Sequence, residues 1–102
     1  MFENFIGRKC IIRSSASGVW HGTVEHAELS GGFAVVRLSG GRRLWRWEGK
    51  ALDCAGLAIH GPRTARIAGA LAGPNIVANV CEINVCSDAA SAAIEAVEPW
   101  NG

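Results

Sequence analysis

The sequence lacks the features that mark several large classes of protein. Its 102 residues carry a formal net charge of only +1, which gives no support for sequence-independent binding to long nucleic acid. Its apolar runs end well before the ~20 residues that a membrane-spanning helix needs. No charged N-terminal region precedes an apolar stretch, so we expect no signal peptide and a cytoplasmic location.

Metal and catalytic motifs are also missing. The four cysteines include no pair with the two-residue spacing of a zinc knuckle or a redox motif, and the three histidines are scattered. There is no Walker loop, no HExxH and no GxSxG sequence. We therefore predict no metal, no cofactor and no catalytic residues, with the cysteines acting as small buried hydrophobes. An enzyme that uses the cysteines or histidines is a third alternative, after the binding and structural functions described below.

What the chain does contain is a series of short β-rich runs separated by turn signals. We predict one domain over residues 1–102, of α+β class and β-rich. Two glycine pairs, at 31–32 and 40–41, read as tight turns, and the serine-rich segment 14–18 reads as a loop. The resulting curled antiparallel meander is similar in architecture to small SH3-like or OB-like barrels. Its four expected strands span residues 9–13, 19–29, 33–38 and 42–48.

The second half changes period and adds one or two short helices. The pattern predicts a short helix over 50–60, an extended piece over 63–67 and a C-terminal helix over 89–97 with Ser87 as its N-cap. Residues 75–86 form the strand richest in β-branched residues, with apolar residues on both faces. This indicates a central strand covered on both sides, or a strand with one face against another subunit.

The segment from Gly40 to Gly49 holds three arginines and two tryptophans. In an extended strand, Arg43, Trp45 and Trp47 share one face, because side chains alternate. Guanidinium groups bind phosphate in a fork and bases stack on indoles, so this face suits a small phosphorylated nucleotide. The alternative is that both indoles are core or subunit-interface residues and the arginines are solvated, because Trp and Arg also dominate protein interfaces.

Other residues could extend such a site. The serine-rich loop offers hydroxyls and backbone N–H groups to an anion, although loops of this kind are more often plain connectors. A chain this small does not easily enclose a nucleotide, so we expect a homo-oligomer with a pocket shared between subunits. The candidate ligand-binding residues are Arg42, Arg43, Trp45, Arg46, Trp47, Arg13, Ser14, Ser15 and Trp20.

Three stretches resemble a family of small tailed-phage proteins, mostly of unknown function. They are the opening Phe5-Ile-Gly-Arg-Lys-Cys-Ile-Ile-Arg-Ser14, the core Arg42-Arg-Leu-Trp-Arg-Trp-Glu-Gly49 and the late Cys81-Glu-Ile-Asn-Val-Cys86. The ending at Pro99-Trp100 is also similar, so the resemblance covers most of the chain. It implies a location in the cytoplasm of an infected bacterial host.

In size and in its lack of catalytic motifs, the chain is also similar to phage "sponge" proteins. These are oligomers that sequester nucleotide immune signals of the cyclic-oligonucleotide or ADP-ribose type. The resemblance implies a counter-defence protein that binds such a signal without cleaving it, but it transfers no pocket residues to this sequence. The alternative is a phage structural or assembly protein whose Trp/Arg strand forms subunit contacts.

Overall fold

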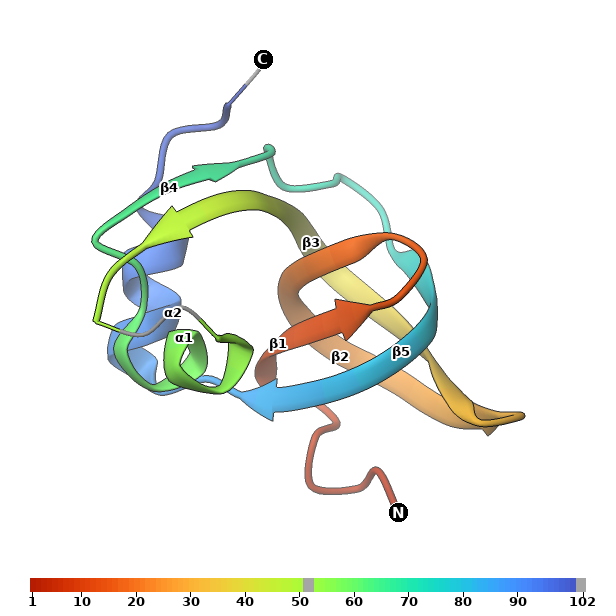
Figure 1. Cartoon of the computed structure of the whole chain (residues 1–102). Coiled ribbons are helices and arrows are strands. Elements are labelled where there is room, and N and C mark those ends of the chain that lie inside the picture. Colours follow the sequence, from red (N-terminus) through yellow and green to blue (C-terminus); the bar gives the residue numbers. More distant parts are fainter. Residues whose placement is uncertain (51–52, 101–102) are drawn as a thin grey trace.

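A computed structural model describes residues 1–50 and 53–100 of the chain (Figure 1). It contains five antiparallel strands in one sheet and two short helices, which confirms the β-rich α+β class. The strands are β1 (Lys9–Ser14), β2 (Gly18–Ser30), β3 (Phe33–Glu48), β4 (Thr64–Ile67) and β5 (Asn75–Val85). The helices are α1 (Cys54–His60) and α2 (Asp88–Glu95).

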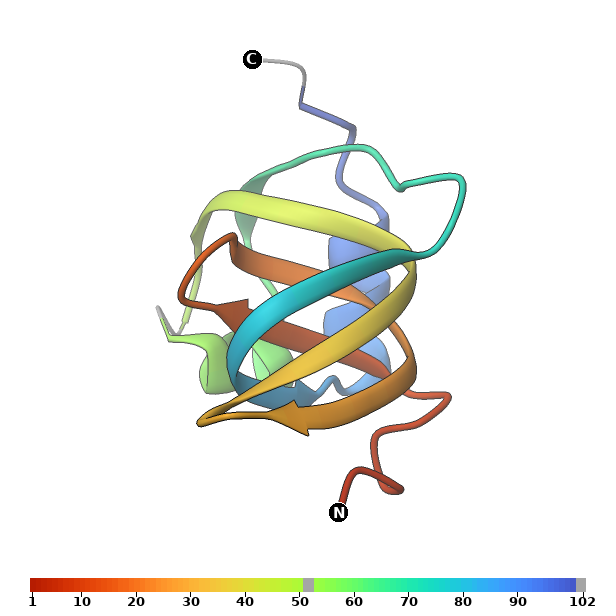
Figure 2. The ribbon, with the colours of Figure 1, turned by 90° about the vertical axis from the view of Figure 1, so that its right-hand side faces the viewer.

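The sheet closes on itself. Its strand order is β2-β1-β5-β3-β4, and an additional pairing between β2 and β3 joins the two sides into a ring of four strands. Figure 2 shows the long β2–β3 hairpin winding around this barrel, with β5 crossing it. One edge of β3 pairs with β5 over residues 34–38 and then with β4 over residues 44–48. The outermost strand, β4, therefore extends the ring at one end.

Strand β3 is continuous, so the prediction of a turn at Gly40-Gly41 is wrong, and residues 9–48 form three strands instead of four. Thr23 pairs with Ser39 and His21 pairs with Arg42, which leaves the glycine pair opposite Gly22 alone. This is a β-bulge, and Gly40 adopts the positive φ of 60° that glycine tolerates best. The other glycine pair does form the predicted turn, with Gly31 at φ 66°.

Two apolar clusters hold the fold together. One fills the barrel interior and the other lies between the sheet and the helices. Strand β1 supplies both, because Cys10 and Ile12 face the interior while Ile11 faces the helices. The two-sided central strand is therefore β1. The prediction that β5 is covered on both faces is wrong within this chain, because Ile76 is 61% exposed.

Bulges explain why the apolar pattern of β5 was misleading. Val77 and Val80 both point into the barrel although they are three residues apart, because Asn79 adopts φ 54° and interrupts the alternation. A second register shift separates the pairing of Ser14 from that of Arg13 along the β1–β5 ladder. Residues that a regular strand would place on opposite faces therefore share one face.

Both helices begin at a capping side chain, and the cap at Ser87 is the one that the sequence predicted. Asp53 accepts a hydrogen bond from the Gly56 N–H at 2.7 Å and caps α1, and Ser87 does the same for α2 through the Ala90 N–H at 3.0 Å. Beyond α2 the chain runs beside β4, where Pro99 bridges to Ile67 in parallel. The first part of the predicted helix over 50–60 falls on residues 51–52, which lie outside the described residues.

Candidate functional site

A second bulge in β3 divides the predicted Arg/Trp face. Leu44 pairs with Ile67 and Arg46 with Arg66, so Trp45 is an extra residue without a partner in β4. Beyond it the alternation is reversed, and Trp47 packs, partly buried, against the cluster beneath the helices. The prediction that Arg43, Trp45 and Trp47 share one face is therefore wrong for Trp47.

Arg43 and Trp45 do lie together, and the C-terminal segment adds two further groups. The Arg43 guanidinium lies over the Trp45 ring, 4.0 Å from its centroid. The Trp100 ring lies 6.4 Å from that of Trp45, tilted by 58°, and the Arg66 guanidinium lies 5.5 Å from the Trp100 ring. We call this row of Arg43, Trp45, Trp100 and Arg66 the Arg–Trp ladder. It is accessible, because Trp45 is 51% and Trp100 is 38% exposed.

Positive charge accumulates beside the ladder. Arg46 lies directly opposite Arg66 on the β3–β4 pair, so both side chains emerge on the same face of the sheet. Like charges in this arrangement repel each other. The only ion pair that Arg46 forms with a described residue is to Glu48, at 3.5 Å between exposed side chains. An anion bound between the two arginines would relieve the repulsion.

Arg42, predicted to hold phosphate, is instead built into the fold. It is only 6% exposed, and its guanidinium donates to three backbone carbonyls. Nε donates to Ala68 at 2.8 Å, and the two terminal nitrogens donate to Ile94 at 2.9 Å and Val97 at 2.8 Å. Two of these carbonyls belong to the C-terminal end of α2 and the residues after it, where cations are favourable.

The remaining candidates lie around the β1–β2 turn, and most of their polar groups contact other groups of this chain. Trp20 is the cross-strand neighbour of Arg43, and its indole N–H donates to Ser17 Oγ at 3.1 Å. Ser14 is buried, and its hydroxyl donates to the Ala78 carbonyl at 2.6 Å. Ser15 Oγ lies 3.5 Å from the Asn79 carbonyl oxygen, and Arg13 lies 3.8 Å from Glu82. Of this group, only Trp20 is brought next to the ladder.

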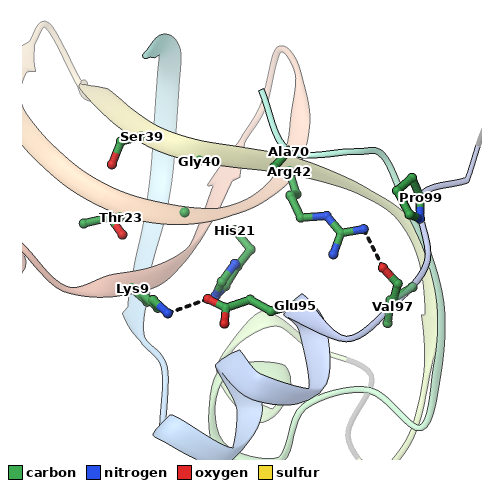
Figure 3. A pocket seen from close by; sticks show the side chains of 11 residues that line it. Lys9, His21, Thr23, Ser39, Gly40, Arg42, Ala70, Glu95, Val97 and Pro99 are labelled. Atoms are coloured by element: carbon green, nitrogen blue, oxygen red, sulfur yellow. Dashed lines mark hydrogen bonds and ion pairs between the residues drawn. The ribbon is translucent and has the colours of Figure 1, made fainter. Parts of the chain in front are cut away.

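A cavity that the sequence did not predict lies where the Gly40-Gly41 bulge meets α2 (Figure 3). It has a volume of about 430 Å³, and we call it the bulge cavity. The Lys9–Glu95 ion pair spans one side of it, and Arg42 reaches over it from β3. The side chains used in the argument below belong to Lys9, His21, Thr23, Ser39, Arg42 and Glu95.

His21 is, with Arg42, a buried polar side chain of this cavity. It is 2% exposed, and its Nε2 lies 3.1 Å from Ser91 Oγ of α2. Burial lowers the pKa of His21 to about 4, with Lys9 and Arg42 lowering it further and Glu95 opposing them. The imidazole is therefore neutral at pH 7.

The glycines inside the β-rich runs are the one feature of the sequence that could have indicated this cavity. A glycine inside a β-rich run marks a bulge or a close backbone approach as readily as a turn. Both occur here, because a Cβ on Gly22 would lie 3.1 Å from the Ser39 carbonyl oxygen and 3.3 Å from the Gly41 Cα. The spacing of Lys9, His21 and Glu95 along the chain gave no comparable signal, because the contact between β1, β2 and α2 is made only by folding.

Comparison with known proteins places the chain in a family. Residues 7–94 match the family described as a domain of unknown function, DUF6948. The chain belongs to this family. Searches of curated proteins and of solved structures found no match. The DUF6948 span contains Arg43, Trp45 and Arg66 and ends before Trp100, so Trp100 lies outside the matched region.

The described part of this DUF6948 chain offers no metal cluster and no membrane-spanning helix, and its buried thiols are protonated. Within residues 1–50 and 53–100, no group of three His, Cys, Asp or Glu side chains is arranged to hold a metal ion. In the same ranges, no helix is long and apolar enough to cross a membrane. Burial raises the pKa of the thiols of Cys54 and Cys86, and that of Cys10 to about 12, so these cysteines stay protonated at pH 7.

Proposed function

We propose that this protein binds a small phosphorylated nucleotide on the Arg–Trp ladder and sequesters it without cleaving it. The observation that supports this proposal is the row of two accessible indoles flanked by two guanidiniums, with a third cation, Arg46, opposite Arg66. Indoles offer flat surfaces to a base, and guanidiniums offer paired donors to phosphate.

The geometry suggests how the ligand lies. The two indoles are tilted by 58° to each other, whereas a base inserted between them would need parallel rings. Each indole already has a guanidinium over it, so a base stacks on Trp45 or Trp100 by displacing Arg43 or Arg66 towards its phosphate. Base–aromatic stacking contributes on the order of 1–3 kcal/mol. The phosphate then lies towards Arg46 and Arg66, where it offsets their repulsion.

The state of the cysteine and histidine side chains favours sequestration of the ligand over its cleavage. Thiolates are the reactive form of cysteine, and burial disfavours the thiolate at Cys10, Cys54 and Cys86. His21 is buried and already lies against Ser91. The resemblance to phage sponge proteins adds the proposal that the ligand is an immune signal of an infected bacterium.

A thermal-shift assay tests the proposal directly. The panel consists of cyclic dinucleotides, cyclic trinucleotides and ADP-ribose isomers. A ligand present at 100 times its dissociation constant adds ~2.7 kcal/mol, which raises Tm by roughly 10 °C or more. Recovery of the intact ligand after denaturation supports sequestration, and recovery of a cleaved product contradicts it.

Matched variants locate the site. Trp45→Ala and Arg66→Ala should remove most of the shift, because each deletes a ladder group. Arg63→Ala is the control, since Arg63 is an exposed arginine three residues away that lies outside the ladder. Equal shifts in the Arg66 and Arg63 variants, or no shift with any member of the panel in the unmodified protein, would contradict the proposal.

A structural or assembly role is the second candidate, and the exposure of Trp45 and Trp100 favours it. Exposed indoles beside arginines are typical of interface hot spots. In that case Trp45→Ala should convert an oligomer into a monomer in analytical ultracentrifugation, with no nucleotide involved. Under the first proposal Trp45→Ala abolishes binding and leaves the assembly state unchanged.

A further inference from the structure

The bulge cavity holds two hydroxyls that form no hydrogen bond within residues 1–50 and 53–100. Thr23 and Ser39 pair directly across β2 and β3, so their side chains share a face, and both line the cavity. Neither hydroxyl hydrogen-bonds to any described residue, unlike Ser14, Ser87 and Ser91. Two adjacent hydroxyl donors are therefore available to a ligand at the point where the bulge bends β3.

The wall above them carries a cation that forms no ion pair with a carboxylate in the part of the chain that the structure describes. A guanidinium has five N–H groups, and Arg42 uses three nitrogens on carbonyls while forming no ion pair with a described residue. A buried charge is normally paired, and the helix carbonyls supply only partial negative charge. Figure 3 shows the Arg42 guanidinium extending over the cavity from β3.

The mouth carries a second cation that is held by an internal carboxylate. Lys9 Nζ pairs with Glu95 at 2.5 Å, and both side chains are about half exposed. The walls therefore carry two positive charges and one negative charge, which leaves a net charge of +1 facing the cavity. Because exposed ion pairs contribute little, a competing anion can displace Glu95 from Lys9 at small cost.

We propose that the bulge cavity binds a small oxyanion, with Arg42 and Lys9 meeting its charge and Thr23 and Ser39 donating to its oxygens. Glu95 competes with the ligand for Lys9. The oxyanion group is a phosphate or a carboxylate, since both offer acceptor oxygens to the same donors. This site is separate from the Arg–Trp ladder, and the proposal does not depend on nucleotide binding at the ladder.

NMR titration of the ¹⁵N-labelled protein tests the proposal, with sodium phosphate in one arm and sodium acetate in the other, at constant pH and ionic strength. We expect saturable shifts of the Thr23, Ser39 and Gly40 amides in at least one arm. The arm that saturates at lower concentration identifies the tetrahedral or the planar anion as the better fit. No saturable shift in either arm, or shifts confined to other residues, would overturn the proposal.

A gain-of-function variant makes the test independent of misfolding. Glu95→Gln removes the competing charge and frees Lys9, so the oxyanion should bind about tenfold more tightly. Glu98→Gln is the matched control, because Glu98 also lies near Arg42 but does not line the cavity. Equal affinities in these two variants would overturn the proposal.

Loss-of-function variants complete the test. Thr23→Val combined with Ser39→Ala removes both hydroxyl donors with little change of shape and should weaken binding about tenfold or more. Trp45→Ala should leave the oxyanion affinity unchanged, whereas it should abolish nucleotide binding at the ladder. The two sites can therefore fail independently, and an oxyanion affinity that falls with Trp45→Ala would overturn the assignment to the cavity.

Discussion

Arg42 ties the C-terminal part of the structure to β3. Its three hydrogen bonds join β3 to Ala68 and to the end of α2. Hydrogen bonds to a charged group contribute ~1.5–3 kcal/mol each, and their contributions are not additive when they share one side chain. We therefore expect Arg42→Met to lower the free energy of unfolding by about 3–5 kcal/mol.

This loss is large for a chain of this size. Domains are commonly stable by ~5–15 kcal/mol, so Arg42→Met removes a substantial share of the total. Arg42→Lys keeps the charge but replaces three nitrogens by one, so it should fall between the methionine variant and the unmodified protein. Urea denaturation followed by circular dichroism measures both. The control is Arg46→Met, which should change stability by less than about 0.5 kcal/mol, since Arg46 is exposed.

A second readout reports on the ladder itself. Arg42 holds the Val97 carbonyl, three residues before Trp100, so its loss should release Trp100 from Trp45. Two indoles in close contact couple their ultraviolet transitions and give a pair of circular-dichroism bands of opposite sign. We expect Arg42→Lys to weaken this pair of bands. Equal unfolding free energies for Arg42→Met and Arg46→Met, with the bands unchanged in Arg42→Lys, would refute the reasoning.

Three further changes have defined outcomes. The folded-state pKa of His21 is depressed from 6.5 to about 4, so the unfolded chain binds the proton first as the pH falls. The free energy of unfolding should therefore be unaffected by this group above pH 6.5 and should fall by about 3 kcal/mol by pH 4. Urea titrations measure this pH dependence, which His21→Gln should flatten. Gly22→Ala should cost roughly 1–3 kcal/mol, since its Cβ meets backbone, whereas Gly32→Ala, with open space around it, should be nearly neutral in the same assay. Ile12→Ala should cost ~2–5 kcal/mol and lower Tm in calorimetry; a near-neutral result would contradict its place in the barrel core.

Local patterns in the sequence predicted the elements but not how they combine. The cap at Ser87, the turn at Gly31-Gly32 and the extended piece predicted over 63–67 follow from short-range signals. The structure confirms them, the last as β4. The glycine pair at 40–41 carries the same local signal as the pair at 31–32, yet it forms a bulge. The difference arises because β5 and β4 hold the two halves of β3 in one strand, and that pairing is tertiary.

In the candidate site, too, the sequence predicted local neighbours but not the contacts made by folding. The sequence indicated Arg43 and Trp45 correctly as neighbours, because two residues on one face of a strand are close whatever the fold. It could not place Trp100 against Trp45, a contact that arises because the C-terminal segment runs beside β4, or Arg66 over the Trp100 ring. It also could not separate Arg42 from Arg43. The two arginines are adjacent in sequence, but one is buried against carbonyls and the other lies on an indole.

The two bulges of β3 account for both candidate sites. Up to Leu38, the even-numbered residues of β3 face the barrel interior. The extra residue at Gly40-Gly41 reverses the alternation, so Leu44 faces the helices, and Arg42 points with it towards α2. The extra residue at Trp45 reverses it again, so Trp47 returns to the helix side while Trp45 is left outside against Trp100. A regular strand would have directed Arg42 into the barrel interior, so the first bulge is what allows a buried arginine to reach the end of α2.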